Sequence, residues 1–302
     1  MTRVRGVGLL TGWGDGVAAL PEDARRVAGD RRVVPVATPS IAGERFRRAT
    51  RECLLGVAAV DAALHEGGLD RAAVAGPRTA LVYVTAAAYG ASNREFIGAG
   101  TASPARAEGG LTGDARGSVG AGTASPARAE GGLTGDARGS APATHRGALY
   151  FPYTAPSSVP AEVAIEYGLT GGYVILVGGP AAGVDALWQA STLLGAGRAD
   201  TVLVLAVETF DECAELWARG RWVTPRPLVE AAACAVLDGD GGEVAYGPGA
   251  VSTLETLAAR RAGQTLACAP LVGLALARAA GMPSARVSGR WRGRCAQFTV
   301  AT

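Results

Sequence analysis

Lysine is absent from this 302-residue sequence, and histidine occurs only twice, at positions 65 and 145. All 29 basic side chains are therefore arginine. The absence of lysine excludes every mechanism that needs a lysine base or a Schiff base. His65 falls near the end of a predicted helix, where a cation is favourable, and His145 follows a polar repeat. We interpret neither histidine as catalytic.

Metal-binding and redox motifs are missing as well. The five cysteines are scattered, with no CxxC pair and no spacing typical of metal ligands, at Cys53, Cys213, Cys234, Cys268 and Cys295. We predict buried, reduced thiols in a cytoplasmic protein without metal or cofactor. No signal peptide and no membrane-spanning apolar stretch is visible. The net charge of +2 gives no indication of nucleic-acid binding.

The stretch at residues 171–198 organises the chain. Its apolar run predicts a strand buried on both faces, comprising Tyr173, Val174, Ile175, Leu176 and Val177. Gly178 and Gly179 allow a tight turn, and Pro180 suits the first turn of a helix that ends at residues 195–197. A strand–turn–helix elbow of this kind often presents a nucleophile. Here its tip is proline, which leaves the geometry of an active site without a reactive atom.

Further apolar strands are predicted at residues 4–11, 79–85 and 201–208. Strand–helix–strand units with short connections indicate a parallel, doubly wound α/β sheet. A long amphipathic helix is predicted at residues 43–67. Its basic first turns are either a solvated face or a landing site for an acidic carrier protein; they contain Arg45, Arg47, Arg48 and Arg51.

An exact internal duplication follows the second strand: residues 98–118 recur letter for letter at 120–140. Its composition predicts a flexible insert at 98–141. Just before it, Tyr89, Ser92 and Phe96 share one helix face, by default a core-packing stripe.

The C-terminal part is short. We predict paired strands at 230–237 and 243–247, helices at 252–262 and 269–280, and a hairpin of 286–291 with 295–300. Because this part is too small to cover a sheet, apolar surface should remain for another chain. The expected division is a half-fold at 1–240 and a reduced second half at 241–302.

Four segments carry a family resemblance, which covers most of residues 4–240. They read GVGLLTGWGDG, TALVYVT, YGLTGGYVILVGGPAAGVDAL and GRADTVLVLAVE. In order and spacing they resemble the β-ketoacyl synthases of the thiolase-like fold. Active members carry a cysteine at the turn after the central strand, and the matching position here is Pro180. The two histidines and the lysine of the family's second half have no counterpart in this sequence.

Within that family the chain is similar to the chain-length factor, the inactive partner of the ketosynthase in type II polyketide synthases. The AAGVDAL helix, the SNREF segment and SGRWRGR near the end carry this likeness. The resemblance implies a heterodimer with a catalytic ketosynthase through the strand at 173–177. It also implies an acyl carrier protein as a partner, and a substrate tunnel shaped by Tyr89, Ser92 and Phe96.

The chain departs from the pattern in three ways: proline replaces the usual glutamine, the second half is shortened, and residues 98–141 are inserted. A divergent branch making polyenes or other reduced chains would fit. Two alternatives stay open: a scaffold that stabilises its partner without touching substrate, and an acyltransferase or hydrolase using Cys213 or a serine near the elbow. Asp185 is more simply interpreted as a helix residue in a salt bridge.

Overall fold

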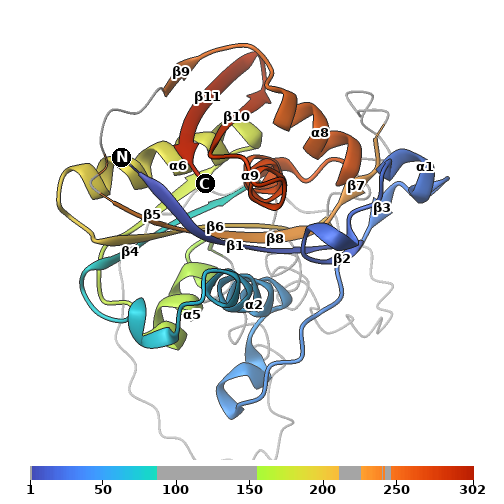
Figure 1. Cartoon of the computed structure of the whole chain (residues 1–302). Coiled ribbons are helices and arrows are strands. Elements are labelled where there is room, and N and C mark those ends of the chain that lie inside the picture. Colours follow the sequence, from blue (N-terminus) through green and yellow to red (C-terminus); the bar gives the residue numbers. More distant parts are fainter. Residues whose placement is uncertain (1, 87–154, 211–225, 240, 242–245) are drawn as a thin grey trace, which may run out of the picture.

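A nine-stranded mixed sheet organises the protein, with helices on both of its faces (Figure 1). The computed structural model describes residues 2–86, 155–210, 226–239, 241 and 246–302. The strand order is β10-β11-β1-β8-β6-β4-β5, with β2 added to β1 and β9 added to β11. These strands are β1 (Arg3–Thr11), β2 (Gly14–Asp15), β4 (Thr79–Thr85), β5 (Tyr173–Val177), β6 (Thr201–Glu208), β8 (Ala231–Asp238), β9 (Tyr246–Pro248), β10 (Ser284–Trp291) and β11 (Arg294–Ala301). A separate small sheet pairs β3 (Val33–Val34) with β7 (Leu228–Val229).

The long apolar strands form where the sequence predicts them. β4, β5 and β6 match the predicted ranges residue for residue, and β1 begins one residue earlier. β4 lies between β5 and β6, parallel to both, as expected for strands joined by helices. β8 runs antiparallel to both β6 and β1. The α/β sheet is therefore confirmed, but its strands are mixed in direction. β4, β5 and β6 are parallel neighbours, as are β1 and β11, while β8 and β10 run the opposite way.

Two helices cover one face of the sheet, α2 (Arg51–Glu66) and α5 (Ser158–Tyr167). The single helix predicted at 43–67 is wrong at its start. A 3-10 turn, η2 (Glu44–Arg48), ends at Ala49, which is extended, and α2 begins afresh after Thr50. The Thr50 hydroxyl accepts a hydrogen bond from the Cys53 N–H, so it caps the new helix.

The opposite face is covered by α6 (Pro180–Gly195) and α9 (Ala269–Ala279), with α8 (Thr253–Arg261) beside them. Both later helices lie within the predicted ranges. α9 is buried along almost its whole length, from Pro270 to Ala277. The antiparallel hairpin of β10 and β11 also forms as predicted. Its backbone pairing with β1 is limited, in the described residues, to Arg3 opposite Ala301, so the hairpin can curl away from the sheet and over α6 and α9.

One predicted pairing is wrong. β9 pairs with β11 and makes no hairpin with β8. The physical reason is that both edges of β8 are already hydrogen-bonded, to β1 and to β6. The strand after the turn must therefore find its partner elsewhere.

Exposed apolar surface was expected on the C-terminal part, but in the described residues it lies mainly on α5 and β5. Outward positions of the hairpin are polar, such as Arg286 and Arg290. The most exposed large apolar side chains of the described residues are Ile165, Tyr173 and Val177, on α5 and β5. Uncovered apolar surface thus gathers at the β5 edge of the sheet. The division at residue 240 stays a prediction. β10 and β11, which follow that residue, belong to the same sheet as β1.

Candidate functional site

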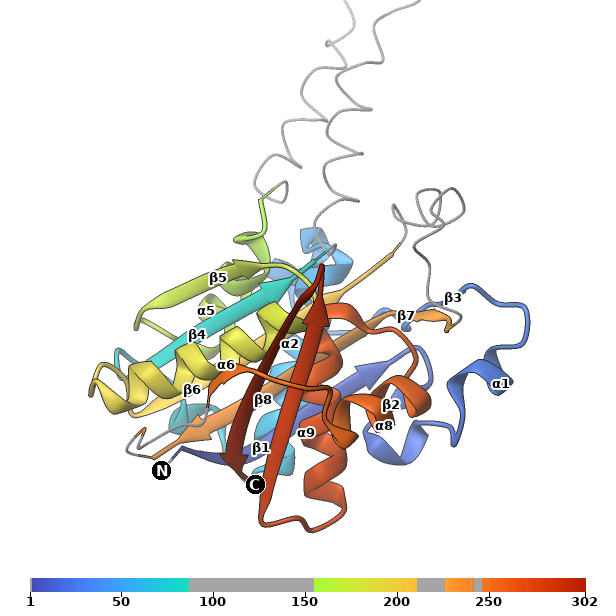
Figure 2. The same cartoon turned by 90° about the horizontal axis from the view of Figure 1, so that it is seen from above.

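The candidate site lies where the parallel strands β4, β5 and β6 end. The Gly178 N–H donates to the Thr85 carbonyl at 2.9 Å, so the ends of β4 and β5 are held side by side. α6 begins at this edge, and the tip of the β10–β11 hairpin reaches it (Figure 2). In open α/β sheets, ligands and reactive groups typically occupy this carboxyl edge.

The predicted elbow is present, with Gly178 and Gly179 as the turn and Pro180 at the first position of α6. The Gly179 carbonyl accepts from the N–H of Ala182 at 2.9 Å. Both Gly179 and Pro180 are buried. Proline brings no N–H and no nucleophilic atom to the helix N-terminus. The tip of the elbow therefore offers only a closed hydrocarbon ring.

The β10 strand packs directly on this elbow. A Cβ atom added to Gly179 would lie 2.4 Å from the Trp291 ring, and one added to Gly289 would lie 2.1 Å from the Pro180 carbonyl oxygen. Glycine is thus required on both sides of the contact, and the indole covers the turn. Trp291 is not among the site residues predicted from the sequence. Its only sequence signal is a tryptophan flanked by glycines in the closing strand.

A buried carboxylate braces the same edge. Glu208, at the end of β6, is fully buried, and its Oε1 accepts hydrogen bonds from Ala86 N–H at 2.7 Å and Ala267 N–H at 3.1 Å. It joins the end of β4 to the short turn η5 (Leu266–Cys268) under the elbow. This role of Glu208 is not predicted from the sequence. The available signal was an acidic residue closing an all-apolar strand.

A second buried carboxylate, Glu230, lies at the start of β8. Arg51 of α2 forms an ion pair with it, and backbone N–H groups of Phe210 and Val36 donate to it at 2.8 and 3.0 Å. Nearby, the Thr209 hydroxyl donates to Glu52 at 2.9 Å. A buried carboxylate that accepts this many hydrogen bonds is fixed in place. These carboxylates hold chain segments in position.

The thiols of the described residues are also unsuited to nucleophilic work. Cys53, Cys234 and Cys268 are buried, and Cys295 is half-buried; all are unpaired. Burial raises the pKa of the Cys53 thiol to about 11, and burial likewise raises the pKa of Cys234, Cys268 and Cys295. Little thiolate exists at neutral pH under these conditions. Cys213 lies outside the described residues.

The basic turns before α2 are largely neutralised by neighbouring carboxylates. Arg45 forms ion pairs with Glu162 and Glu166 of α5 at 3.1 and 3.3 Å. Arg47 pairs with Glu44 at 3.0 Å, and Arg51 is used by the buried carboxylate at the start of β8. This arrangement favours a structural role for these arginines over a landing site for an acidic partner.

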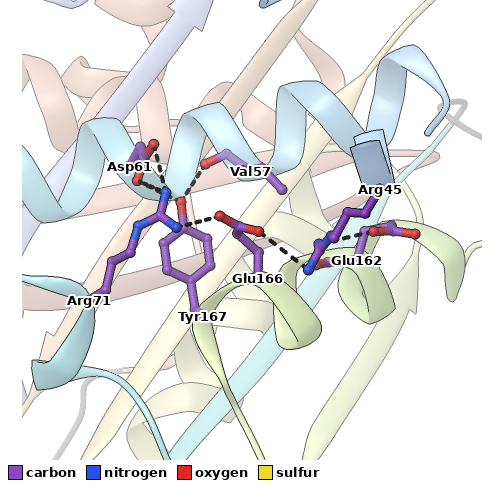
Figure 3. A network of polar contacts seen from close by, with 7 residues as sticks. All are labelled: Arg45, Val57, Asp61, Arg71, Glu162, Glu166 and Tyr167. Atoms are coloured by element: carbon purple, nitrogen blue, oxygen red, sulfur yellow. Dashed lines mark hydrogen bonds and ion pairs between the residues drawn. The ribbon is translucent and has the colours of Figure 1, made fainter. Parts of the chain in front are cut away.

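Figure 3 shows how the same network fastens α5 to α2. The Arg71 guanidinium bonds Asp61 at 3.2 Å, reaches Glu166, and lies 5.0 Å from the centre of the Tyr167 ring. The Tyr167 hydroxyl lies 2.8 Å from an Asp61 oxygen and 2.9 Å from the Val57 carbonyl, and shares its proton between them. α5 leads into β5 through a short connection. The network therefore positions the strand that ends at the elbow.

β5 departs from the prediction of burial on both faces. Its side chains are half-buried or exposed; Tyr173 and Val177 are 62% and 58% exposed. The reason is that β5 is the last strand of the sheet and, among the residues that the structure describes, pairs only with β4. The residues expected at an interface thus occupy one free sheet edge.

The remaining predicted residues have the following places. Asp185 of α6 forms the expected salt bridge, with Arg294 at 2.6 Å, and accepts from the Tyr246 hydroxyl at 2.7 Å. His65 is exposed in the last turn of α2. The predicted tunnel residues Tyr89, Ser92 and Phe96 lie outside the described residues. His145 and the insert at 98–141 do so as well.

The described residues contain no group of three or more His, Cys, Asp and Glu side chains that could hold a metal ion. Among the helices of the described chain, none has the length and apolarity needed to cross a membrane.

Comparison with known proteins gives a fold. No protein-family model and no curated protein matches the sequence. Among solved structures, the ishigamide ketosynthase/chain length factor aligns with a TM-score of 0.64 and 14% identity over 99% of this chain and 98% of that one. A type II polyketide synthase acyl carrier protein in complex with its ketosynthase (AntDE:AntF) aligns with a TM-score of 0.67 and 13% identity, over 100% of this chain and 99% of that one. A β-ketoacyl synthase from Burkholderia phymatum aligns with a TM-score of 0.61 and 11% identity, over 100% of this chain and 99% of that one. The chain has the thiolase-like ketosynthase fold.

Proposed function

Starting from this thiolase-like ketosynthase fold, we propose that the chain is a non-catalytic subunit of the chain-length-factor type. It pairs with an active ketosynthase and shapes a polyketide, such as a polyene, during elongation on an acyl carrier protein. The observation that carries the proposal is the elbow. The position that the family resemblance assigns to the nucleophile is Pro180, buried between a glycine turn and the strand β10.

The free edge at β5 supports the pairing step. An edge strand presents unpaired N–H and C=O groups, which a strand of a second subunit can complete. The exposed side chains of Tyr173 and Val177 add apolar surface that pairing would bury. The partner ketosynthase would thereby continue the sheet across the heterodimer and supply the cysteine for condensation.

The shaping step rests on the resemblance. Tyr89, Ser92 and Phe96 would line the substrate tunnel, and bulky groups there would limit how long a chain can grow. Exchange of Phe96 for alanine in the complex should therefore lengthen or redistribute the products. Unchanged product lengths would favour a scaffold that stabilises its partner without touching substrate.

Co-expression with a ketosynthase of the same synthase tests the proposal. We expect one stable heterodimer by size exclusion and light scattering, polyketide products only from the pair, and no condensation by this chain alone. Val177→Glu should separate the subunits, because it places a charge in the pairing edge. Val27→Glu is the matched control: Val27 is 48% exposed and belongs to α1 (Ala24–Ala28), at the end of the sheet away from β5. Carbon–carbon bond formation or stable acylation of the isolated chain would contradict the proposal.

A further inference from the structure

A small basic cavity lies at the end of the sheet away from β5, where α1, α8 and the start of β7 come together (Figure 1). Its volume is about 240 Å³, and it is lined by Asp23, Arg25, Arg226, Ala259 and Arg260. Three guanidinium groups and one carboxylate therefore surround one small space. Like charges gathered in this way repel one another, and an anion between them relieves the repulsion.

The charges of this cavity are largely left for a ligand. Arg25 and Arg260 are exposed, and neither forms an ion pair within the part of the chain that the structure describes. Asp23 is the one acid of the lining, and it is already used. Its Oδ1 accepts hydrogen bonds from the backbone N–H groups of Arg25 and Arg26 at 2.9 and 3.2 Å, which caps α1. The cavity thus keeps an excess of positive charge.

The three segments that carry the arginines are tied together by hydrogen bonds. Arg261, at the end of α8, donates from its guanidinium to the Leu20 carbonyl at 2.8 Å and so fastens α8 to the loop before α1. The Gln264 N–H donates to the carbonyl of Pro227 at 2.9 Å, directly beside Arg226. The backbones under the guanidinium groups are therefore fixed relative to one another. A site built in advance loses less entropy when it binds a ligand.

Size and chemistry select the ligand. Pockets for drug-sized molecules occupy about 300–1,000 Å³, so this cavity suits a smaller species. The planar guanidinium fork matches the paired oxygens of a phosphate group better than a single point charge does. A net charge of +2 for the whole chain does not indicate a nucleic-acid footprint. A small oxyanion with several acceptor oxygens fits these properties.

We propose that Arg25, Arg226 and Arg260 bind a phosphate group, either as inorganic phosphate or as the phosphate end of a soluble phosphomonoester. This inference goes beyond the proposed function and does not depend on it, since the cavity lies at the end of the sheet away from the β5 edge (Figure 1). The bound anion bridges α1 and α8, so it stabilises the folded chain by mass action.

The test titrates the full chain with inorganic phosphate by calorimetry at constant ionic strength. The cavity variant is Arg25→Gln/Arg260→Gln. The matched control is Arg26→Gln/Arg32→Gln, which removes the same charge from two nearby exposed arginines that do not line the cavity. We expect about tenfold weaker phosphate binding for the cavity variant and unchanged binding for the control. Titration with glycerol 3-phosphate distinguishes the two sources: tighter binding than inorganic phosphate indicates a phosphomonoester, and weaker binding indicates the free ion.

Urea unfolding with and without phosphate gives a second measurement. Phosphate stabilises many proteins because it is excluded from their surface, so the comparison between variants is what matters. The phosphate-dependent rise in the unfolding midpoint should be larger for wild type and control than for the cavity variant. If the double variant does not fold, Arg260→Gln alone provides the same comparison. Absence of saturable binding by wild type, or equal binding by wild type and cavity variant, would overturn the inference, as would an equal loss in the control.

Discussion

The indole ring of Trp291 occupies the space that a side chain at Gly179 would need. Ring atoms lie 2.4–2.9 Å from the position of a Cβ at residue 179. This contact joins two segments that are more than a hundred residues apart in the sequence. It ties the closing strand of the sheet to the turn at which the family resemblance expects a nucleophile.

Gly179→Ala is therefore expected to destabilise the protein by about 2 kcal/mol, since the added methyl group overpacks the contact. The measurement is urea unfolding followed by tryptophan fluorescence. Gly172→Ala is the matched control, because no atom lies within 4 Å of a Cβ there. Removing the ring in Gly179→Ala/Trp291→Ala should make the two effects non-additive. Equal stability of both glycine variants would show that the ring does not fill this space.

Tyr167→Phe should weaken the attachment of α5 to α2. The hydroxyl is within 2.8 Å of Asp61 and 2.9 Å of the Val57 carbonyl, and burial raises the pKa of Tyr167. Loss of a buried hydrogen bond to a charged group costs about 1.5–3 kcal/mol. Tyr173→Phe, at an exposed tyrosine on β5, should leave the free energy of unfolding unchanged. A similar effect of both changes would contradict the network.

Asp238 should give a pH-dependent contribution to stability. Burial alone would raise the pKa of Asp238, but hydrogen bonds and charge from Arg3 and Arg5 outweigh it and hold the pKa below its ordinary value. The folded state thus favours the ionised form, so the contribution is present above the unfolded pKa of about 3.9 and is lost as pH falls through the folded pKa. Asp238→Asn should cost about 0.5–1 kcal/mol at pH 7. The difference should shrink below about pH 4, which urea unfolding at several pH values would measure.

Four cysteine thiols of the folded protein should react slowly with a labelling reagent. In a Cys213→Ser protein, iodoacetamide at neutral pH should modify Cys53, Cys234 and Cys268 only after unfolding, and Cys295 slowly, because burial raises the pKa of each thiol. Mass spectrometry with and without urea gives the rates. Rapid modification of the folded variant would revive the alternative of a nucleophile among these residues.

The long elements could be predicted because their patterns are local. The all-apolar runs of β4 and β6 and the apolar period of α6 specify each element within its own residues. The elbow follows for the same reason, since the glycines and Pro180 stand next to one another. The helix at 43–67 fails at Thr50 because capping by one hydroxyl outweighs a continuous amphipathic pattern.

What the sequence does not show are contacts across long separations. Trp291 contacts Gly179, Arg51 forms an ion pair with Glu230, and β9 pairs with β11 because both edges of β8 are taken by β1 and β6. The periodicity of apolar residues in the sequence does not predict which residues form these contacts. The burial of β5 was predicted wrongly because an apolar run looks the same in a central strand and in an edge strand.

The two ends of the main sheet differ. At one end, β10 curls over the helices and packs on the elbow, while at the other, β5 remains open to solvent. If the second subunit pairs along the β5 edge, as proposed, the two edges that join are both used up. Pairing along this edge would then close at two subunits and leave neither β5 edge open to extend the sheet into a fibre.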